Sequence, residues 1–318
     1  MSNFSLIIFT CSDDGTVNRL EPLLDVQYVR VNLDKPETWS FEGGLESWTL
    51  SSSVKTIDNS TNAYVWWWKA FLDDFPLDDF VKAELQYIAR ELYHEFVSKG
   101  LFVGNDFLHH EYRGKRHYLK SANAFLRVPK SLISQNGQAR LDSDDIIVKS
   151  LASSPFSSKK VLYTTRVSQS RLDFHHPWFI QEFIEASYDV TIQIVGAELF
   201  AFERVRVPGQ TVDWRKEQNY STKVREWNPI SLNQNQLIQI KNFLRTENLT
   251  WGRIDLLKTN ADELVFLEFN ANGQFGFLDP LNELGLFSSV AKYLSNEQNL
   301  VHSSQGKSSI IGTTRLGI

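Results

Sequence analysis

The residue types best suited to chemistry lie in the apolar stretch 251–270. Read as a β-hairpin with residues 260–263 as its loop, this stretch places Asp255 directly opposite Glu268. Because side chains alternate between the two faces of a strand, each strand of the hairpin has one polar and one apolar face. The predicted apolar face carries Ile254, Leu256, Val265, Leu267 and Phe269.

The polar face of this hairpin gathers carboxylate and amide oxygens. Asp255 and Glu268 repel one another when they lie across a strand ladder, and Asn270 follows on the same face as Arg253. An all-oxygen cluster of this kind is what a hard cation such as Mg²⁺ prefers. A solvated polar face has the same pattern, so the residues by themselves leave a magnesium site and a solvent-exposed face as alternatives.

Two lysines stand at positions where a positive charge would need an anion. Lys149 ends the apolar run 146–148, and Lys115 opens a predicted helix. A lysine at the end of a buried strand is costly unless its ammonium group meets an anion, and a polyphosphate is a suitable partner. Taken singly, each lysine is better explained by an exposed position on the surface.

The composition is that of an ordinary globular protein and excludes several classes of function. With 318 residues, 42% hydrophobic and 22% charged, the chain has room for two domains or one three-part enzyme. The net charge of −5, without a long single-sign block, excludes nucleic-acid binding by bulk charge. The single cysteine, Cys11, excludes a disulfide framework and a cysteine-based zinc site. No signal peptide and no membrane span of ~18 apolar residues is found, so we expect a cytoplasmic protein without a membrane partner.

The elements that must position these side chains begin with an α/β unit. A strand is predicted over 6–9, a short helix over 17–24 and a second strand over 26–31. A small antiparallel excursion is expected over 37–64. Residues 66–68 are three adjacent tryptophans, which cannot all face one side of a strand. We therefore expect at least one of them at the surface or at a contact.

Helices and strands alternate through the rest of the chain. The clearest helix is expected over 80–98, capped by Asp78 or Asp79 and ended by Gly100, and a second helix over 115–125. The remaining elements are, in order, strands over 145–149 and 160–165 joined by a serine-rich hairpin tip, strands over 178–184, 190–195 and 199–207, a helix over 234–245 capped by Ser231, the hairpin over 251–270 and a last helix over 287–294.

Six motifs in order resemble those of the ATP-grasp ligases. Within that family, Asp213-Trp214-Arg215 resembles the D-x-R element of the graspetide (microviridin-type) peptide maturases, and the segment 266–274 is also most similar to that branch. The ribosomal-protein glutamate ligases are the next most similar group. The six motifs are Lys115-x-x-x-Leu119-x-x-Ala122, Val128-Pro129, Val148-Lys149, and the segments 180–186, 252–255 and 266–274.

The resemblance implies an α/β (α+β) class with the ATP-grasp fold in three parts. An N-terminal α/β domain would span 1–104, a central subdomain with a lid 105–183, and a C-terminal antiparallel-sheet subdomain with the metal site 184–318. ATP and Mg²⁺ are the implied cofactors. By the same resemblance, Lys115 and Lys149 would bind phosphates, Gln181, Glu182, Phe183 and Ile184 would form the adenine hinge, Asp189 would lie near the ribose, Asp255, Glu268 and Asn270 would hold Mg²⁺, and Asp213, Arg215 and Arg204 would face the reacting carboxylate.

The resemblance also implies an activity, an ADP- and phosphate-forming ligase that acts on a ribosomally made precursor peptide with a leader and a core. Asp or Glu side chains would become acyl phosphates, and a Thr or Ser hydroxyl or a Lys amine would then close an ω-ester or ω-amide ring. Such a reaction depends on positioning and charge neutralisation rather than on a protein nucleophile. A homodimer is implied as well. Two alternatives stay open: a glutamate-ligase type enzyme that adds free amino acids, and a non-catalytic nucleotide-binding subunit that recruits a precursor through an aromatic surface around Trp66.

Overall fold

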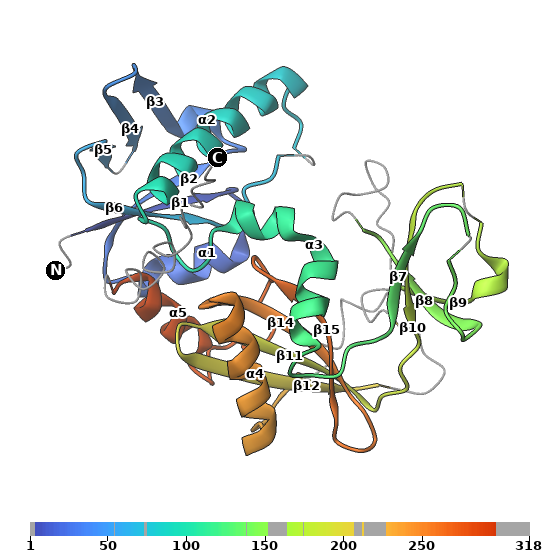
Figure 1. Ribbon diagram of the computed structural model, residues 1–318. Helices are drawn as coiled ribbons and strands as arrows, with labels where there is room; N and C mark the ends of the chain where they lie inside the picture. Colours follow the sequence, from blue (N-terminus) through green and yellow to red (C-terminus); the bar gives the residue numbers. More distant parts are fainter. Residues whose placement is uncertain are drawn as a thin grey trace, which may run out of the picture.

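The fold is organised around four β-sheets within the residues that the computed structural model describes, which are 4–53, 55–72, 75–137, 139–151, 164–173, 175–206, 212 and 227–296. Figure 1 shows the blue N-terminal part at the left, the small green sheet of β7 to β10 at the right and the yellow and orange strands between them. A parallel sheet with helices and separate antiparallel sheets occur together. The predicted mixed α/β class is therefore confirmed.

The N-terminal part is built on a parallel sheet in the order β2, β1, β6. β1 (Ser5–Thr10) is buried over its whole length between β2 (Gln27–Asn32) and β6 (Ala63–Trp67). Parallel strands need crossover connections, which cover the faces of the sheet. α1 (Gly15–Leu20) packs on one face and α2 (Asp79–Ser98) on the other. The predicted strand, helix and second strand are confirmed.

A second, antiparallel sheet accounts for the predicted excursion. It consists of β3 (Trp39–Gly43), β4 (Trp48–Ser52) and β5 (Thr56–Asp58). Its apolar residues Leu50 and Ile57 are buried in the same core as α2. Short 3₁₀ turns lie at Glu21–Leu23, Pro36–Thr38 and Gln169–Arg171.

The three adjacent tryptophans are all buried, and of the two predicted positions, surface or contact, the structure shows the contact. Trp66 and Trp68 lie on one side, with ring centroids 5.1 Å apart, and both meet Trp251 edge-on. Trp67 lies on the other side, against Tyr93 of α2. The three rings are only 1%, 4% and 0% exposed. Successive side chains of a strand point to opposite faces of the sheet. All three tryptophans are buried because both faces of this sheet are covered.

The two helices that follow differ in how well their limits were predicted. α2 begins after Asp78, whose side chain accepts a 2.9 Å hydrogen bond from the backbone N–H of Phe80, and the chain turns away at Gly100 with φ of 74°. α3 (Phe107–Ala122) contains a kink at Gly114, where φ is 72°. Its second segment opens at residue 115 as predicted, but it ends three residues earlier than expected.

A four-stranded antiparallel sheet stands apart from the rest of the molecule in Figure 1. Its order is β7 (Ser131–Ser134), β10 (Trp178–Glu182), β8 (Asp145–Lys149) and β9 (Thr165–Ser168). β8 and β10 were predicted, whereas β7 was missed because it is only four residues long. The serine-rich hairpin tip and most of the strand predicted over 160–165 lie outside the described residues.

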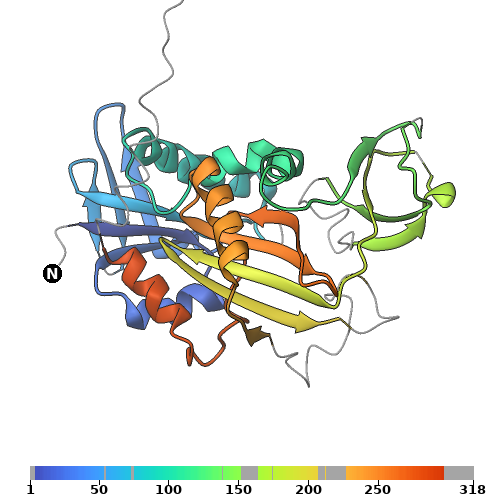
Figure 2. The ribbon, with the colours of Figure 1, turned by 60° about the horizontal axis from the view of Figure 1, so that its bottom comes forward.

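The largest sheet carries the predicted acidic hairpin. α4 (Gln234–Glu247) and the second segment of α3 cover one of its faces, as Figure 2 shows. α4 is capped by Asn233, not by the predicted Ser231, because a capping box forms with Gln236. The sheet is antiparallel throughout, in the order β13 (Asn228–Pro229), β12 (Glu198–Val205), β11 (Tyr188–Val195), β14 (Trp251–Lys258) and β15 (Leu264–Asn270).

The last helix packs the C-terminal end of the described chain against the N-terminal part. α5 (Leu286–Leu294) packs beside α1 against the parallel sheet, in a core that also contains Trp66 and Trp251. Figure 2 shows α5 and α1 side by side below that sheet. The N-terminal and C-terminal parts therefore share one continuous hydrophobic core.

Candidate active site

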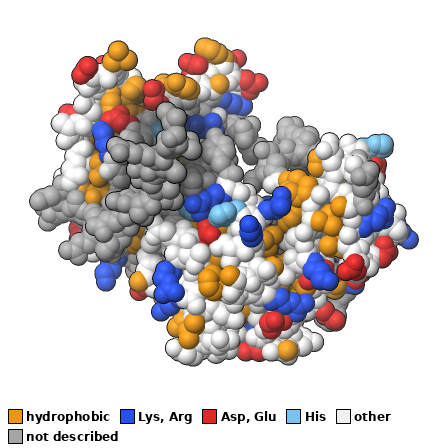
Figure 3. All heavy atoms as spheres, viewed as in Figure 1, with side chains coloured by type: hydrophobic (Ala, Val, Ile, Leu, Met, Phe, Trp, Pro, Cys, Tyr) orange, Lys and Arg blue, Asp and Glu red, His pale blue; other side chains and the backbone are white. Residues whose placement is uncertain are grey.

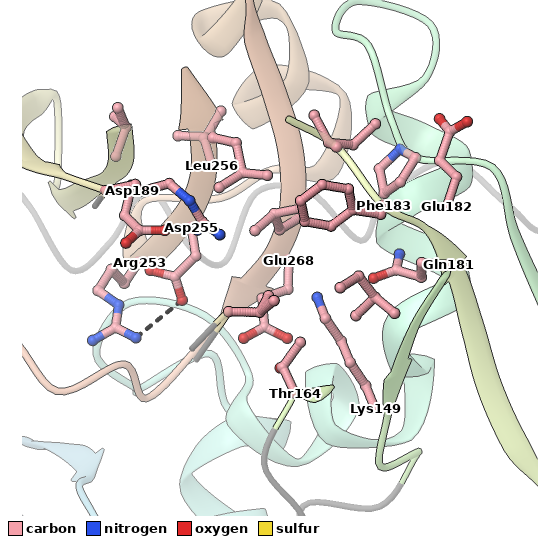
Figure 4. A pocket seen from close by; sticks show the side chains of 18 of the residues that line it. Lys149, Thr164, Gln181, Glu182, Phe183, Asp189, Arg253, Asp255, Leu256 and Glu268 are labelled. Atoms are coloured by element: carbon pink, nitrogen blue, oxygen red, sulfur yellow. Dashed lines mark hydrogen bonds and ion pairs between the residues drawn. The ribbon is translucent and has the colours of Figure 1, made fainter. Parts of the chain in front are cut away.

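One pocket lies between the small sheet of β7 to β10 and the large sheet that carries the acidic hairpin (Figure 4). The predicted site residues that line it come from β8, from β10 and the residues after it, and from the large sheet. Figure 3 shows basic side chains gathered with an acidic one near the centre of the molecule's face. The predicted residues in the lining are Lys149, Gln181, Glu182, Phe183, Ile184, Asp189, Asp255 and Glu268.

The two predicted acidic residues face each other across the strand ladder. Asp255 on β14 is the direct partner of Glu268 on β15. Asn270 donates its amide N–H to Asp255 Oδ2 at 2.8 Å and lies 3.5 Å from Glu268 Oε1. The structure therefore brings the three predicted metal ligands together, with an amide donor between two carboxylates.

A β-bulge sets this pairing and corrects the predicted hairpin. Lys258 pairs with Leu264, so the register at the loop is one residue away from the prediction, and a shift between Asp255 and Leu256 restores it. Ile254, Leu256 and Phe269 lie in the core under α3 and α4 as expected. Val265 and Leu267 instead lie on the opposite side of the sheet, because the bulge reverses the facing of the strand beyond it.

Two lysines bring positive charge to Glu268 from different elements. Lys115 of α3 lies 3.8 Å from Glu268 Oε2 and donates a 2.9 Å hydrogen bond to the carbonyl of Ser150. Lys149 of β8 points toward the Glu268 carboxylate in Figure 4. Burial alone would raise the pKa of Glu268, but the two ammonium groups hold that pKa below its usual range. Glu268 is therefore ionised at neutral pH.

Two residues that the sequence reasoning did not assign hold Asp255 in place. Arg253 lies 3.0 Å from Asp255 Oδ2, and Thr191 donates a 2.9 Å hydrogen bond to Asp255 Oδ1. A glycine at 252 is required beside Arg253, since its φ is 125° and a Cβ there would lie 2.6 Å from the ring of Phe269. The Arg253 pairing has a local signal, two residues from Asp255 on one strand face, whereas Thr191 is distant in the sequence.

Asp189 is held by two arginines. Arg204, with an exposed fraction of 6%, lies 2.5 Å from Asp189 Oδ2, and Arg206 pairs with Asp189 Oδ1. Arg206 lines the pocket and was not among the predicted site residues. Alternation of Arg204 and Arg206 along one strand could have indicated it, because residues two apart share a face. Asp189 therefore balances part of the charge of Arg206 at the pocket and of Arg204 behind it.

The other end of the pocket is formed by residues 181–184, at the end of β10. Gln181 donates a 2.9 Å hydrogen bond to Ser131 Oγ, and Glu182 Oε1 accepts one from the backbone N–H of Lys130 at 3.1 Å. These two side chains are therefore hydrogen-bonded to β7 and to the residue before it. Ile184 is buried beside Leu257 and Val265.

Phe183 is supported from behind by a charged pair. The guanidinium carbon of Arg166 lies 3.6 Å from the centroid of the Phe183 ring. Arg166 is itself held by Asp145, which accepts hydrogen bonds from Nε, at 2.7 Å, and from Nη2. Each partner shifts the pKa of the other through these hydrogen bonds, lowering that of Asp145 and raising that of Arg166.

Asp213 and Arg215 lie outside the described residues. Among the described residues, no group of three or more His, Cys, Asp or Glu side chains is arranged to hold a metal ion, since the cluster here has two carboxylates and an amide. No helix in the described part of the chain is long and apolar enough to cross a membrane.

Comparisons with known proteins give structural matches alone. No protein-family model matches the chain, and no curated protein matches it in sequence. A RiPP-associated ATP-grasp ligase of Chryseobacterium gregarium, in complex with ADP and a leader and core peptide, matches with a TM-score of 0.78 at 22% identity, covering 92% of this chain and 96% of that one.

Two further structures are similar over nearly the whole chain. The macrocyclase MdnC of Microcystis aeruginosa, bound with precursor peptide MdnA, has a TM-score of 0.73 at 21% identity, covering 92% of this chain and 99% of its own. The ATP-grasp ligase PsnB, complexed with a minimal precursor, has a TM-score of 0.70 at 15% identity with the same coverages. The chain therefore has the fold of the ATP-grasp ligases.

Proposed function

We propose that the protein is an ATP- and Mg²⁺-dependent ligase that closes ω-ester or ω-amide rings in a ribosomally made precursor peptide. The observation that carries the proposal is the cluster of Asp255, Glu268 and Asn270 facing Lys115 and Lys149. The fold, shared with ligases whose structures contain precursor peptides, supports a peptide as the substrate.

The acidic cluster suits a hard cation. Asp255 and Glu268 offer carboxylate oxygens, and the Asn270 amide now donates to Asp255, between the two acids where a cation would balance their charge. Turning that amide about its last side-chain bond would direct its oxygen to the same place. Mg²⁺ bound there would neutralise phosphate charge and orient the triphosphate.

The other predicted residues would bind the remaining parts of the nucleotide and the reacting carboxylate. Lys115 and Lys149 would neutralise phosphate oxygens, since both already lie close to the ionised Glu268. The backbone at 182–184 would meet the adenine edge, because the side chains of Gln181 and Glu182 are engaged elsewhere. Asp189 would lie near the ribose and also hold Arg204 and Arg206, which would face the reacting carboxylate with Asp213 and Arg215.

The proposed reaction has two steps. An oxygen of a substrate Asp or Glu carboxylate attacks the terminal phosphorus of ATP, and ADP leaves. A Thr or Ser hydroxyl or a Lys amine then attacks the acyl carbon, phosphate leaves, and one proton is released. Both steps depend on holding anions in place, so the arginines and lysines do the work without a protein nucleophile.

The experiment that tests the proposal is the intact mass of precursor peptides encoded beside the gene, after incubation with the protein and Mg-ATP. Loss of one water per ring, with matching ADP release, is the expected result. Glu268→Ala should abolish it while the far-UV circular dichroism spectrum stays unchanged. Asp142→Asn is the matched control, because Asp142 is an exposed acid that pairs with Lys130 on the surface. Full activity of the Glu268→Ala variant would refute the mechanism.

The same measurement separates the alternatives. A mass gain that requires a free amino acid would assign the protein to the glutamate-ligase type. The non-catalytic alternative loses its stated basis, since Trp66 is buried and offers no aromatic surface. Recognition of a leader segment and a homodimer stay part of the proposal, and light scattering of the purified protein tests the dimer.

A further inference from the structure

The second segment of α3, which begins after Gly114, carries Lys115 to the acidic end of the pocket. The backbone at Gly114 is not helical, with φ of 72° and ψ of 169°. Lys115 therefore lies in the first turn of a helical segment, where the backbone N–H groups have no partner within the helix. Tyr118, Leu119 and Ala122 are buried in the core beside the large sheet. Packing in the core thus holds this segment from Tyr118 onward, beyond the turn that carries Lys115.

A buried carboxylate of α4 makes charged contacts with this first turn. Glu247 is the last residue of α4, and its side chain is only 7% exposed. Arg113 Nη1 donates a 2.7 Å hydrogen bond to Glu247 Oε2, and His117 Nε2 lies 2.8 Å from the same oxygen. The two nitrogens lie 3.4 Å from each other. One carboxylate oxygen therefore joins α4 to the residues two positions before and two positions after Lys115.

Glu247 occupies a position where an acid is unfavourable unless cations meet it. The C-terminal end of a helix carries partial negative charge, and α4 ends at Glu247, before Asn248 with φ of 52°. Burial alone would raise the pKa of Glu247, but hydrogen bonds and charges from α3 hold that pKa below its usual range. The Glu247 carboxylate is therefore ionised at neutral pH, with Arg113 as its positive partner.

The contacts with α4 and the contact with the acidic pair lie on opposite sides of the segment. Lys115 and His117 are two residues apart in a helix, which separates their side chains by about 200° around the axis. Lys115 lies 3.8 Å from Glu268 Oε2 on β15, whereas His117 meets Glu247 on α4. α4 is itself fixed, because its buried residues lie in the same core as the large sheet. The turn that carries Lys115 is therefore held between a packed helix and the acidic end of the pocket.

We propose that Glu247 is a positioning residue for Lys115. By pairing with Arg113 and His117, Glu247 holds the first turn of the second segment of α3. The Lys115 ammonium group then stays beside Glu268, where it would meet the phosphates of the nucleotide. The proposal rests on the proposed function and deepens it. Glu247 does not line the pocket, so its effect on the nucleotide passes through Lys115.

A double-mutant cycle on nucleotide binding tests the proposal. Glu247→Gln removes the charge and keeps the shape, Lys115→Met removes the cation, and a third variant carries both changes. We expect Glu247→Gln alone to raise the Kd of Mg-ADP about 3- to 10-fold, a part of what the loss of a hydrogen bond to a charged group costs. In the Lys115→Met background the same change should raise that Kd less than about two-fold, because the two residues act as one unit. Equal factors in the two backgrounds overturn the proposal.

Two further variants complete the binding test. Arg113→Met breaks the same pair from the other side and should raise the Kd of Mg-ADP by the same factor as Glu247→Gln. Because the Arg113 side chain is 31% exposed, this variant keeps the test valid if Glu247→Gln folds poorly. Glu263→Gln is the matched control, since it breaks an exposed pair with Arg127 at 2.9 Å, and it should leave the Kd unchanged. A wild-type Kd in Arg113→Met overturns the proposal.

Hydrogen exchange tests the positioning without a nucleotide. The backbone amides of residues 115–122 should exchange faster in Glu247→Gln than in the wild type, because the first turn opens more often. The amides of α2 should exchange at the same rate in both proteins. Mass spectrometry of peptic peptides measures the rates, and an unchanged rate over 115–122 overturns the proposal. The proposed function fails separately, if Mg-ADP does not bind or if no ring forms, and the exchange rates still decide the role of Glu247.

Discussion

The two ends of the pocket are built in different ways. At the acidic end, charged side chains converge from four elements: Lys115 from α3, Lys149 from β8, Asp255 with Arg253 from β14, and Glu268 from β15. At the end proposed to form the adenine hinge, called the hinge end here, residues 181–184 lie where β10 ends. Gln181 and Glu182 are held by Ser131 and Lys130, and Ile184 packs against the large sheet. A charge cluster needs elements brought from far apart, whereas a hinge needs one strand with a well-supported end.

The difference also concerns free energy. Facing carboxylates oppose folding, because like charges close together are unfavourable, the more so where they are partly desolvated. The hinge end is held mainly by hydrogen bonds and by the Arg166 contact with Phe183, which favour the folded state. Substitutions should therefore affect activity most at the acidic end, and at the hinge end they should affect nucleotide affinity more moderately.

The largest effect is expected for Glu268→Ala. Removal of the carboxylate leaves Lys115 and Lys149 without the charge that faces them and removes one oxygen of the proposed magnesium site. Ring formation should fall by at least about 100-fold, the range seen when one catalytic electrostatic group is removed. Intact-mass assays of precursor turnover measure it. A variant that retains more than about a tenth of the activity would show that the acidic end is not the catalytic end.

The next effect is on stability and is expected for Gly252→Ala. A Cβ at this position would lie 2.6 Å from Phe269, and φ is 125°. The free energy of unfolding should fall by about 1–3 kcal/mol, because overpacking and an unsuitable backbone conformation both act. Urea denaturation measures it. Gly44→Ala is the matched control, since nothing lies within 4 Å of a Cβ there, and an equal loss in both variants would contradict the explanation.

Lys69→Met should stabilise the protein at neutral pH. Burial and then the charge of Arg253 lower the pKa of Lys69, which follows β6, to about 8 from 10.5 in the folded protein, so its protonated form is disfavoured by folding. The variant should gain about 1–3 kcal/mol at pH 7. The gain should shrink as pH rises from about 8 toward 10.5, since only the unfolded wild-type chain still binds the proton there. Denaturation at pH 7 and pH 10 compares the two proteins, and a gain that does not depend on pH would point to packing instead.

The smallest effect is expected at the hinge end, for Arg166→Met. The variant keeps the aliphatic stem but loses the cation over Phe183 and the pair with Asp145. The Kd of Mg-ADP should rise about two- to five-fold, as for an exposed cation–π contact. Binding of inorganic tripolyphosphate, which lacks the base, should not change. Equal weakening of both ligands would place Arg166 at the phosphates and remove the contrast between the two ends.

Local patterns predicted most elements and the acidic pair. The strands at both ends of the chain and the two long helices follow from apolar periodicity, because each buries one regular face. The facing of Asp255 and Glu268 was predicted correctly although the loop register was wrong by one residue, since the bulge between Asp255 and Leu256 restores the pairing. The roles of these residues stay predictions until the assays above are made.

What the sequence missed depends on partners that are remote along the chain. Thr191 binds Asp255 from β11, and Arg253 donates a hydrogen bond to the carbonyl of Gln274 in the segment after β15. The burial of all three tryptophans likewise depends on α2, α5 and Trp251 covering both faces of the sheet. No local spacing contains that information.

The sequence by itself determined the mixed α/β class, the order of most elements and the pairing of the acidic hairpin, because these depend on residues within a few turns or strands of one another. Only the tertiary structure decided which way Val265 and Leu267 face, which arginines hold Asp189, and where Lys69 lies. Bulges, burial and charge pairing depend on which residues lie close together in space. Segments that are distant in the sequence come close only when the hydrophobic core forms.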